Sequence, residues 1–236
     1  MIKSIVMAFA ALAACSSGKA TPGPQVAAGD DLHPVVVELY QSQGCSSCPP
    51  ANANLNAVAG KKGVLALSFA VTYWDQLGWK DQFAKPQYTQ RQWDFANTSG
   101  RGNVATPQVI VNGSGNMTGA DKAHFARLLS VGGPKGGPAI GIDGNGVTIG
   151  AGKGAQPATV WLVRYDPRTR NVAIRAGENG GRTLPHRNIV TELRALGRWS
   201  GAAARFGVTP SADKALLSAI LVQQGTGGPI VAARKI

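Results

Sequence analysis

Residues 35–50 read VVVELYQSQGCSSCPP, and this stretch decides the fold that we expect. Its β-branched and apolar first part predicts a buried strand over residues 35–40. After a turn, residues 51–59 carry apolar side chains at helical spacing. The pattern therefore predicts a strand-to-helix turn that places Cys45 at the N-terminus of a helix, with Cys48 three residues further on.

This cysteine pair has the spacing that thiol–disulfide exchange requires. Free backbone N–H groups and the helix dipole favour a thiolate at a helix N-terminus, where thiol pKa values of roughly 3.5–7.5 replace the usual value of about 8.5. Cys48 is close enough to attack a mixed disulfide formed at Cys45. We therefore predict that Cys45 is an accessible nucleophile and that Cys48 is the resolving thiol.

Zinc sites also use the C-x-x-C spacing, but they normally need a second cysteine pair or two histidines. The three histidines, His33, His124 and His186, are far apart in the sequence. No flavin, nicotinamide or P-loop motif is present. We therefore predict neither a metal site nor a cofactor.

The N-terminal residues have the pattern of an export signal. Lys3 precedes a short apolar segment, and residues 12–15 read LAAC, which resembles the lipobox of bacterial lipoproteins. We predict a signal peptide over residues 1–15, lipidation at Cys15 and a flexible tether over residues 16–33. The protein would then be secreted or periplasmic and lipid-anchored at the outer membrane. The alternative is an ordinary cleaved signal with an incidental cysteine.

The composition indicates a globular protein. Of its 236 residues, 44% are hydrophobic and 15% are charged, which excludes a disordered chain. The net charge is +12, and residues 131–236 hold 14 Lys and Arg against 5 Asp and Glu. Because these cations are scattered and no nucleic-acid motif accompanies them, we interpret them as a solvated basic surface and predict no nucleic-acid partner.

The second half has a different pattern. Glycine and proline cluster over residues 132–138, and short apolar segments separated by turn residues follow. The expected strand pairs are residues 139–142 with 147–149, residues 159–165 with 171–175, and residues 219–223 with 230–233. This pattern predicts a sandwich-like, β-rich domain over residues 138–236, packed on a first domain over residues 34–131 and covering its cysteine face.

Several motifs together resemble one known family. They are CSSCPP at residues 45–50, YWDQLGWKD at 73–81, TPQ at 106–108 and GENGGRTL at 177–184. They are similar to those of a bacterial secreted family that has a thioredoxin-like fold and is catalogued as a domain of unknown function. The resemblance implies an α/β thioredoxin-like unit over residues 34–131. Ala70 and Thr72 stand where the family usually carries His and Asp, so we assign no proton-transfer or metal-ligand role there.

The resemblance also implies roles for residues around the cysteines. Thr106 and Pro107 would form a cis-proline loop that offers backbone groups to a substrate. Glu38 would accept a proton from Cys48, with a pKa raised by burial, unless it faces solvent or an arginine. Independently of the resemblance, Trp74 could form an apolar wall with Tyr73 and Trp79 that contacts a client peptide, unless these residues are a packed aromatic cluster.

Three functions are compatible with these features. The first is an exported thiol–disulfide oxidoreductase that acts on client proteins or on small-molecule thiols and disulfides. The second is a copper-binding or copper-delivery protein, since soft thiolates suit Cu(I). The third is a non-catalytic envelope binding protein in which the disulfide is structural. The sequence leaves open whether a redox-active pair would oxidise, reduce or isomerise its clients.

Overall fold

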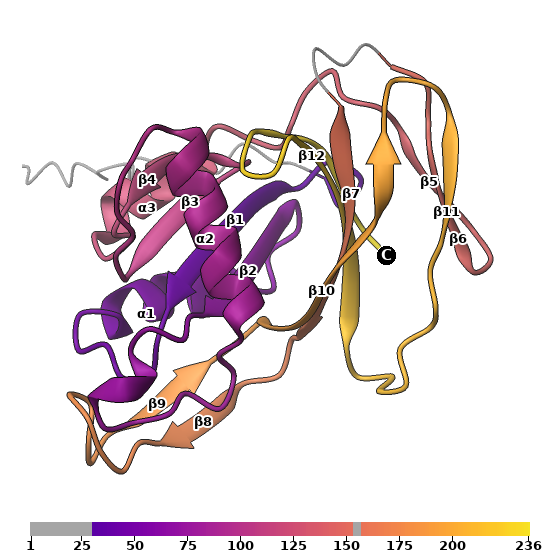
Figure 1. Cartoon of the computed structure of the whole chain (residues 1–236). Coiled ribbons are helices and arrows are strands. Elements are labelled where there is room, and N and C mark those ends of the chain that lie inside the picture. Colours follow the sequence, from indigo (N-terminus) through magenta and orange to yellow (C-terminus); the bar gives the residue numbers. More distant parts are fainter. Residues whose placement is uncertain (1–29, 153–156) are drawn as a thin grey trace, which may run out of the picture.

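The computed structural model describes residues 30–152 and 157–236 (Figure 1). The first half alternates strands and helices. Its elements are β1 (Val35–Gln41), α1 (Pro49–Val58), β2 (Val64–Ala70), the short 3₁₀ helix η1 (Asp75–Leu77), α2 (Pro86–Thr98), β3 (Gln108–Val111), β4 (Ser114–Met117) and α3 (Lys122–Leu129). Within the described part of the chain, no helix is long and apolar enough to cross a membrane.

In the described residues, the second half consists of strands and loops. Its strands are β5 (Ile140–Asp143), β6 (Gly146–Ile149), β7 (Ala158–Asp166), β8 (Arg170–Ala173), β9 (Thr183–His186), β10 (Ile189–Trp199), β11 (Ala204–Gly207), β12 (Leu217–Gln224) and β13 (Ile230–Lys235). The hairpins expected near residues 140–149 and 219–233 are confirmed as β5–β6 and β12–β13. The expected pairing of residues 171–175 with 159–165 is wrong, because β8 pairs with β9 while β7 lies between β10 and β12.

One mixed sheet of eight strands runs through both halves, in the order β13-β12-β7-β10-β2-β1-β3-β4. The halves join where β10 runs parallel to β2, with Ile189 opposite Ser68. Asn188 prepares this junction: its carbonyl accepts the Ser68 N–H at 2.9 Å, and its side chain donates to the carbonyls of Ala59 and Ala66. The strands predicted for residues 138–236 therefore do not all form a separate sheet.

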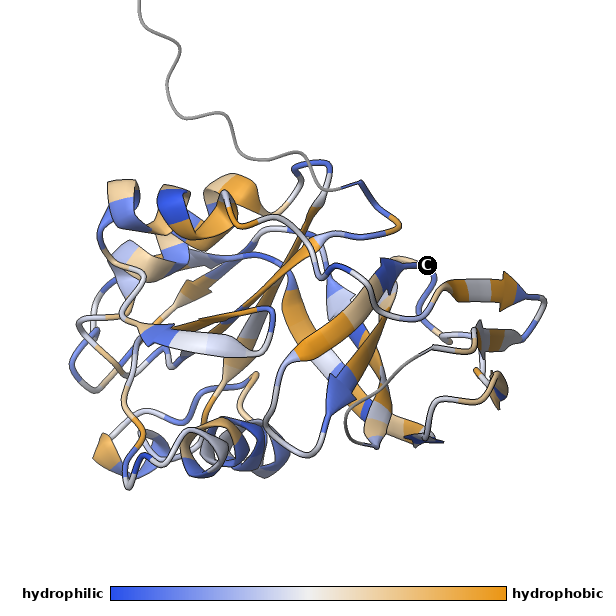
Figure 2. Ribbon diagram, turned by 90° about the horizontal axis from the view of Figure 1, so that it is seen from above, coloured by the Kyte–Doolittle hydropathy of each residue, from blue (hydrophilic) through white to orange (hydrophobic). Residues whose placement is uncertain are grey.

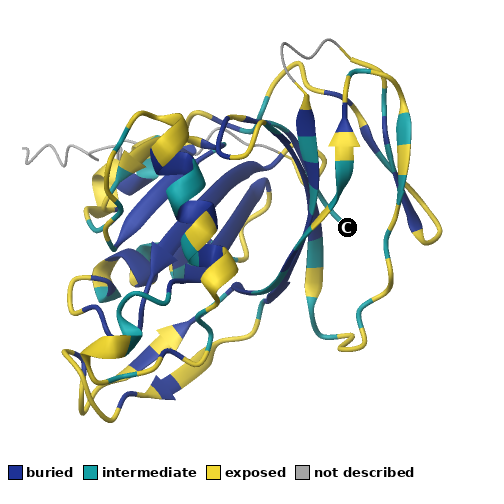
Figure 3. Cartoon of the chain, in the orientation of Figure 1, coloured by how far each residue is buried: buried dark blue, intermediate teal, exposed yellow. Residues whose placement is uncertain are grey.

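Helices cover both faces of the first-half strands, as Figure 2 shows. The side chains of β1 alternate between these faces. Val35, Val37 and Leu39 pack with α1 and α3, whereas Val36 and Tyr40 pack with α2. Because both faces are covered, every residue of β1 and β2 is buried, and the strands appear as a dark band in Figure 3. This explains the unbroken apolar run at the start of β1.

The sheet curls around α2 until its two ends meet. The N–H of Ile230, at the start of β13, donates to the carbonyl of Asn112 in the β3–β4 turn at 2.9 Å. A Cβ at Gly113 would lie 2.5 Å from the carbonyl oxygen of Gly228, so only glycine fits at this close approach. On the second half, the small sheet β11-β6-β5 packs over β7 and β12 through a separate apolar cluster that includes Ile149 and Leu162.

A buried ion pair lies inside this curl. Arg91 of α2 donates from two nitrogens to the Glu38 carboxylate, both at 2.8 Å, and from a third to Gln223 of β12 at 2.9 Å. Tyr40 donates its hydroxyl to the same carboxylate at 2.7 Å. The guanidinium also lies over the ring of Phe95. One arginine therefore connects α2 to strands of both halves.

We expect Arg91→Met to lower the free energy of unfolding by about 3–5 kcal/mol, because it leaves the Glu38 carboxylate buried without its cation. The double variant Arg91→Met with Glu38→Gln leaves no buried charge and should recover part of this loss. Urea unfolding monitored by circular dichroism measures both. A double variant no more stable than the single one would assign the loss to packing of the arginine.

Candidate functional site

Cys45 and Cys48 form a disulfide between the end of β1 and the start of α1, with their Cα atoms 5.4 Å apart. Neither cysteine has any exposed surface, whereas Ser46 and Ser47 between them are exposed. The prediction of an accessible Cys45 is therefore wrong for this closed, oxidised form. An incoming thiolate could not reach either sulfur without movement of the groups that cover them.

The helix begins slightly before the helical stretch expected at residues 51–59, but its first residue lies after both cysteines, so Cys45 is not at the helix N-terminus itself. Cys48 is the residue that precedes the first turn, and Pro49 and Pro50 are the first two helical residues. Proline suits these positions but has no N–H group. Cys45 thus lies in the turn before the helix, and the helix end offers it fewer free N–H groups than an ordinary N-terminus would.

The predicted proline loop lies beside the disulfide. The Thr106–Pro107 peptide bond is cis, as the sequence suggested. The Ser47 hydroxyl lies 3.3 Å from the Cys45 sulfur and 3.4 Å from the Thr106 carbonyl oxygen, to which it donates. Trp74 donates its indole N–H to the Thr106 hydroxyl at 2.7 Å. The structure therefore brings five of the candidate residues into one cluster: Cys45, Cys48, Thr106, Pro107 and Trp74.

The loop between β8 and β9 covers this cluster from the second half. Asn179 is fully buried, and its amide donates to the carbonyls of Gln43 and Cys45 at 2.8 and 2.9 Å. Glu178 accepts the Ser46 N–H at 2.9 Å. Arg182 donates to the Asn179 side-chain oxygen at 2.7 Å. We name residues 177–182 the clamp loop; Figure 1 shows its hairpin beside the first half.

The clamp loop confirms the expectation that the second half covers the cysteine face. No role was predicted for Asn179 from the sequence. The signal that could have found it was the glycine-rich motif itself. At Gly177 φ is +71°, and a Cβ there would lie 3.2 Å from the Cβ of Trp79, so glycine is required for this close contact.

A second missed residue is Asp81, in the loop after η1. Its carboxylate is almost fully buried and accepts the N–H of Gln43 at 2.8 Å and that of Phe83 at 2.9 Å. Burial raises the pKa of Asp81 to about 6, although these hydrogen bonds act in the opposite direction. Trp79 donates its indole N–H to the Gln43 side chain at 2.9 Å. Both residues thus hold the backbone that leads into Cys45.

Glu38 does not belong to this cluster. It points to the α2 face of β1, and both of its oxygens accept hydrogen bonds from Arg91. Its neighbour Leu39 points to the opposite face, which α1 covers. The alternative in which Glu38 faces an arginine is the arrangement observed, and the structure gives no contact between Glu38 and Cys48.

Comparison of the sequence with known protein families assigns this chain to one of them. The family described as "Protein of unknown function (DUF1223)" matches residues 36–223. The chain belongs to the DUF1223 family. The crystal structure of protein AGR_C_4864 from Agrobacterium tumefaciens is similar to this DUF1223 chain, with 31% identity, a TM-score of 0.69 and coverage of 86% of this chain and 93% of that one.

A more distant similarity concerns the fold alone. HBP35 of Porphyromonas gingivalis has 14% identity and a TM-score of 0.58, and the match covers 88% of this chain and 76% of that one. No curated protein matches this DUF1223 chain.

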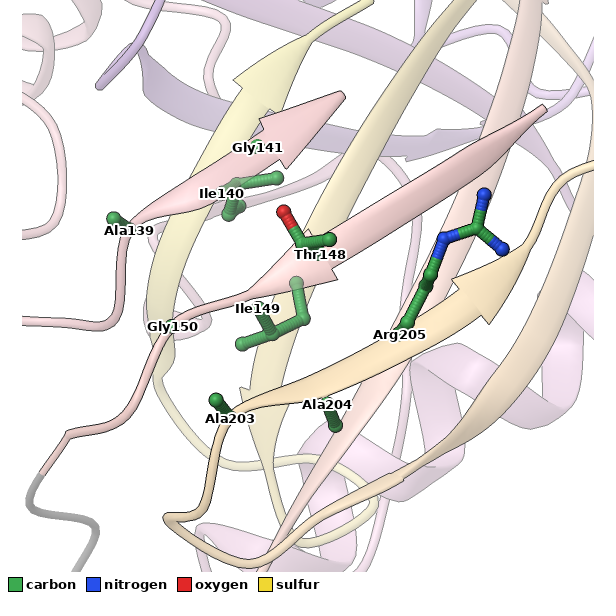
Figure 4. A pocket seen from close by; sticks show the side chains of 9 residues that line it. All are labelled: Ala139, Ile140, Gly141, Thr148, Ile149, Gly150, Ala203, Ala204 and Arg205. Carbon is green, nitrogen blue, oxygen red and sulfur yellow. The ribbon is translucent and has the colours of Figure 1, made fainter. Parts of the chain in front are cut away.

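The remaining predictions for this DUF1223 chain concern its N-terminal residues and metal ligands. The predicted lipidation site Cys15, the signal peptide over residues 1–15 and most of the tether over residues 16–33 lie outside the described residues. In residues 30–152 and 157–236, no three His, Cys, Asp or Glu side chains cluster as metal ligands would. A hollow of about 500 Å³ lies on the small sheet, lined mostly by apolar residues with Thr148 and Arg205 (Figure 4).

His186 is a buried base in the β8–β9 hairpin, which carries the clamp loop. It lies on β9 against the ring of Phe83, and neither ring nitrogen has a hydrogen-bond partner. Burial lowers the pKa of His186 to about 4. It makes no hydrogen bond with Glu178 or Arg182 in the described structure.

We expect His186→Phe to reduce the acid sensitivity of the fold. In the wild type the pKa is about 6.5 when unfolded and about 4 when folded, so the unfolded state binds the proton first as pH falls through this window. The contribution of His186 to the free energy of unfolding is thus fully present above pH 6.5 and falls by about 3 kcal/mol towards pH 4. Urea unfolding at pH 7 and pH 4 should show a smaller decline for the variant.

Asp81 provides the opposite control. Its folded pKa of about 6 exceeds the unfolded value of 3.8, so the folded state binds this proton first and gains stability as pH falls. Asp81→Asn should therefore make the decline between pH 7 and pH 4 steeper. Equal declines for wild type, His186→Phe and Asp81→Asn would contradict both assignments.

Proposed function

We propose that this protein is an exported thiol–disulfide oxidoreductase-like protein in which Cys45 is the nucleophile and Cys48 the resolving thiol. The observation that carries this proposal is the Cys45–Cys48 disulfide packed beside the loop at Thr106 and Pro107, where the Ser47 hydroxyl donates to the Thr106 carbonyl. A pair three residues apart needs little backbone movement to pass between disulfide and dithiol. A client bound next to the sulfurs would contact the Thr106 carbonyl and the indole of Trp74.

The topology of the first half supports a thioredoxin-like assignment for residues 34–131. Its strand order is β2-β1-β3-β4, with β1 and β2 parallel and β3 and β4 antiparallel to their neighbours. Helices α1 and α3 cover one face and α2 the other. A thioredoxin-like unit has this arrangement, with its cysteines at the start of the first helix.

In the proposed exchange, the reduced cysteine pair transfers two electrons to a client disulfide in two steps. The Cys45 thiolate attacks one sulfur of a client disulfide, a bond forms between these sulfurs, and the other client sulfur leaves as a thiolate and takes a proton. The Cys48 thiolate then attacks the Cys45 sulfur and releases the second client thiol. Two electrons pass from the protein dithiol to the client, which is a protein or a small-molecule disulfide. Client oxidation is the same sequence in reverse.

The covered disulfide favours a second candidate function. If the clamp loop never opens, the disulfide is structural and the protein is a non-catalytic envelope binding protein. No observation favours the copper alternative in the same way. Under the leading proposal the clamp loop moves aside when a client binds.

We expect Cys48→Ser to accumulate a mixed disulfide between Cys45 and glutathione when the protein is incubated with oxidised glutathione, because no resolving thiol remains. Intact-mass spectrometry measures the adduct. Cys45→Ser is the matched control and should react much more slowly, because the Ser47 hydroxyl, 3.3 Å from the Cys45 sulfur, can donate to a thiolate at Cys45 and has no such contact with Cys48. Absence of an adduct in folded Cys48→Ser would favour the structural disulfide.

We expect Asn179→Ala to speed reduction of the disulfide by dithiothreitol about tenfold, because two buried hydrogen bonds that hold the clamp loop closed are lost. The matched control is Asn54→Ala. Asn54 also donates two hydrogen bonds from its side chain, but to Gly119 and Ala120, away from the clamp loop. Alkylation of the released thiols over time measures the rate. Equal rates in Asn179→Ala and the wild type would show that this loop does not limit access.

A further inference from the structure

Glu178 is the residue of the clamp loop that places a charged side chain beside residues 45–48, which we name the cysteine loop. Its side chain is exposed, yet one carboxylate oxygen accepts the N–H of Ser46 at 2.9 Å. This hydrogen bond lowers the pKa of Glu178 below its usual value, so the group is ionised at neutral pH. A full negative charge therefore lies at the amide that directly follows Cys45.

The Ser46 N–H matters because the backbone offers Cys45 few other donors, so that a thiolate there would otherwise depend on the Ser47 hydroxyl, 3.3 Å from the sulfur. Pro49 and Pro50 supply none. The Cys48 N–H donates to the Cys45 carbonyl at 3.2 Å, and the Asn52 N–H donates to the Cys48 carbonyl at 3.0 Å. A thiolate at Cys45 would need backbone donors of this kind, and Glu178 already occupies the one next to it.

We propose that Glu178 opposes formation of the Cys45 thiolate and so holds the cysteine pair in its oxidised form, which makes it a weak oxidant of clients. This inference rests on the proposed function and gives it a direction. A pair with this property is reduced by a strong dithiol reductant, and in its dithiol form it passes electrons to client disulfides.

Two other charged groups lie near this position. Arg182 is on the clamp loop, but its guanidinium donates to Asn179. Asp81 lies on the neighbouring loop and acts on Cys45 through the backbone of Gln43. The other side-chain hydrogen bonds from residues 45–48 to the rest of the protein, from Asn179 to the Cys45 carbonyl and from Ser47 to the Thr106 carbonyl, involve neutral groups. Of these groups, Glu178 is the one whose charged side chain hydrogen-bonds a residue between the two cysteines. Its charge can be removed by the isosteric change Glu178→Gln.

The coupling is reciprocal. Reduction of the disulfide consumes two electrons and two protons from a dithiol, which becomes a disulfide. When Cys45 then loses its proton, its thiolate and the Glu178 carboxylate compete for one N–H and repel each other. By linkage, whatever strengthens the closed clamp loop in the oxidised form also favours that form over the reduced one.

Glu178→Gln tests this inference, because glutamine can still accept the Ser46 N–H but has no charge. Asp143→Asn is the matched control: it removes one exposed carboxylate charge from the β5–β6 hairpin on the small sheet. The measurement is the equilibrium constant between the protein and the dithiothreitol couple at pH values from 6 to 10, read by alkylation. The absorbance of the thiolate at each pH gives the pKa of Cys45 in the same samples.

We expect Glu178→Gln to favour the reduced form about tenfold above the pKa of Cys45, which is about 30 mV for this two-electron couple. The thiolate fraction should rise by a similar factor. Below that pKa the thiol is neutral and the charge-dependent part of the difference should vanish, leaving only a constant offset from the weaker hydrogen bond. A merely structural role for Glu178 would give the constant offset alone.

Two outcomes overturn the inference. One is a pH-independent difference between Glu178→Gln and the wild type, and the other is an equal shift in Asp143→Asn. The proposed function fails separately, if the wild-type disulfide stays closed to dithiothreitol in the folded protein. In that case opening of the disulfide in Glu178→Gln would still support the inference, and a disulfide that stays closed in the variant would overturn it.

Discussion

The buried pair of Arg91 and Glu38 is the interaction on which the arrangement of the other elements depends. Helix α2 lies inside a curled sheet, and its one arginine reaches β1 of the first half and Gln223 of the second. A buried charge of this kind is costly unless it is fully paired, so the pair favours one position of α2 against both sets of strands. That position in turn fixes the ends of β1 and β2, and hence the turn that carries the cysteines.

The cysteine site is made by both halves of the chain. The first half contributes the disulfide, the proline loop and Trp74, which are the parts that the proposed exchange chemistry needs. The second half contributes Glu178 and Asn179, which close the site and place a charge beside it. Under the proposed function, access to the sulfurs and the stability of a thiolate would depend on the second half, although the reacting atoms belong to the first.

Local signals in the sequence were enough for the parts of the structure that local rules govern. The apolar run of β1, the cysteines before a helix, the proline before β3 and the β12–β13 hairpin all follow from nearest neighbours in the chain. The pairs that complete the structure are remote: Glu38 with Arg91 is separated by 53 residues, and Asn179 with Cys45 by 134. No periodicity or spacing rule relates such positions, so the burial of Cys45 and the role of Glu38 were not predictable.

The single junction between β2 and β10 has a consequence for how the chain is made. Residues 64–70 form a strand that is buried along its whole length, and in the described residues the strand that pairs with its outer edge is β10, through residues 188–189. During synthesis, more than a hundred residues separate the appearance of this edge from that of its partner. An apolar strand edge left open for that interval is a template for pairing between chains, so the nascent first half is the stage of its life at which this protein is most exposed to aggregation.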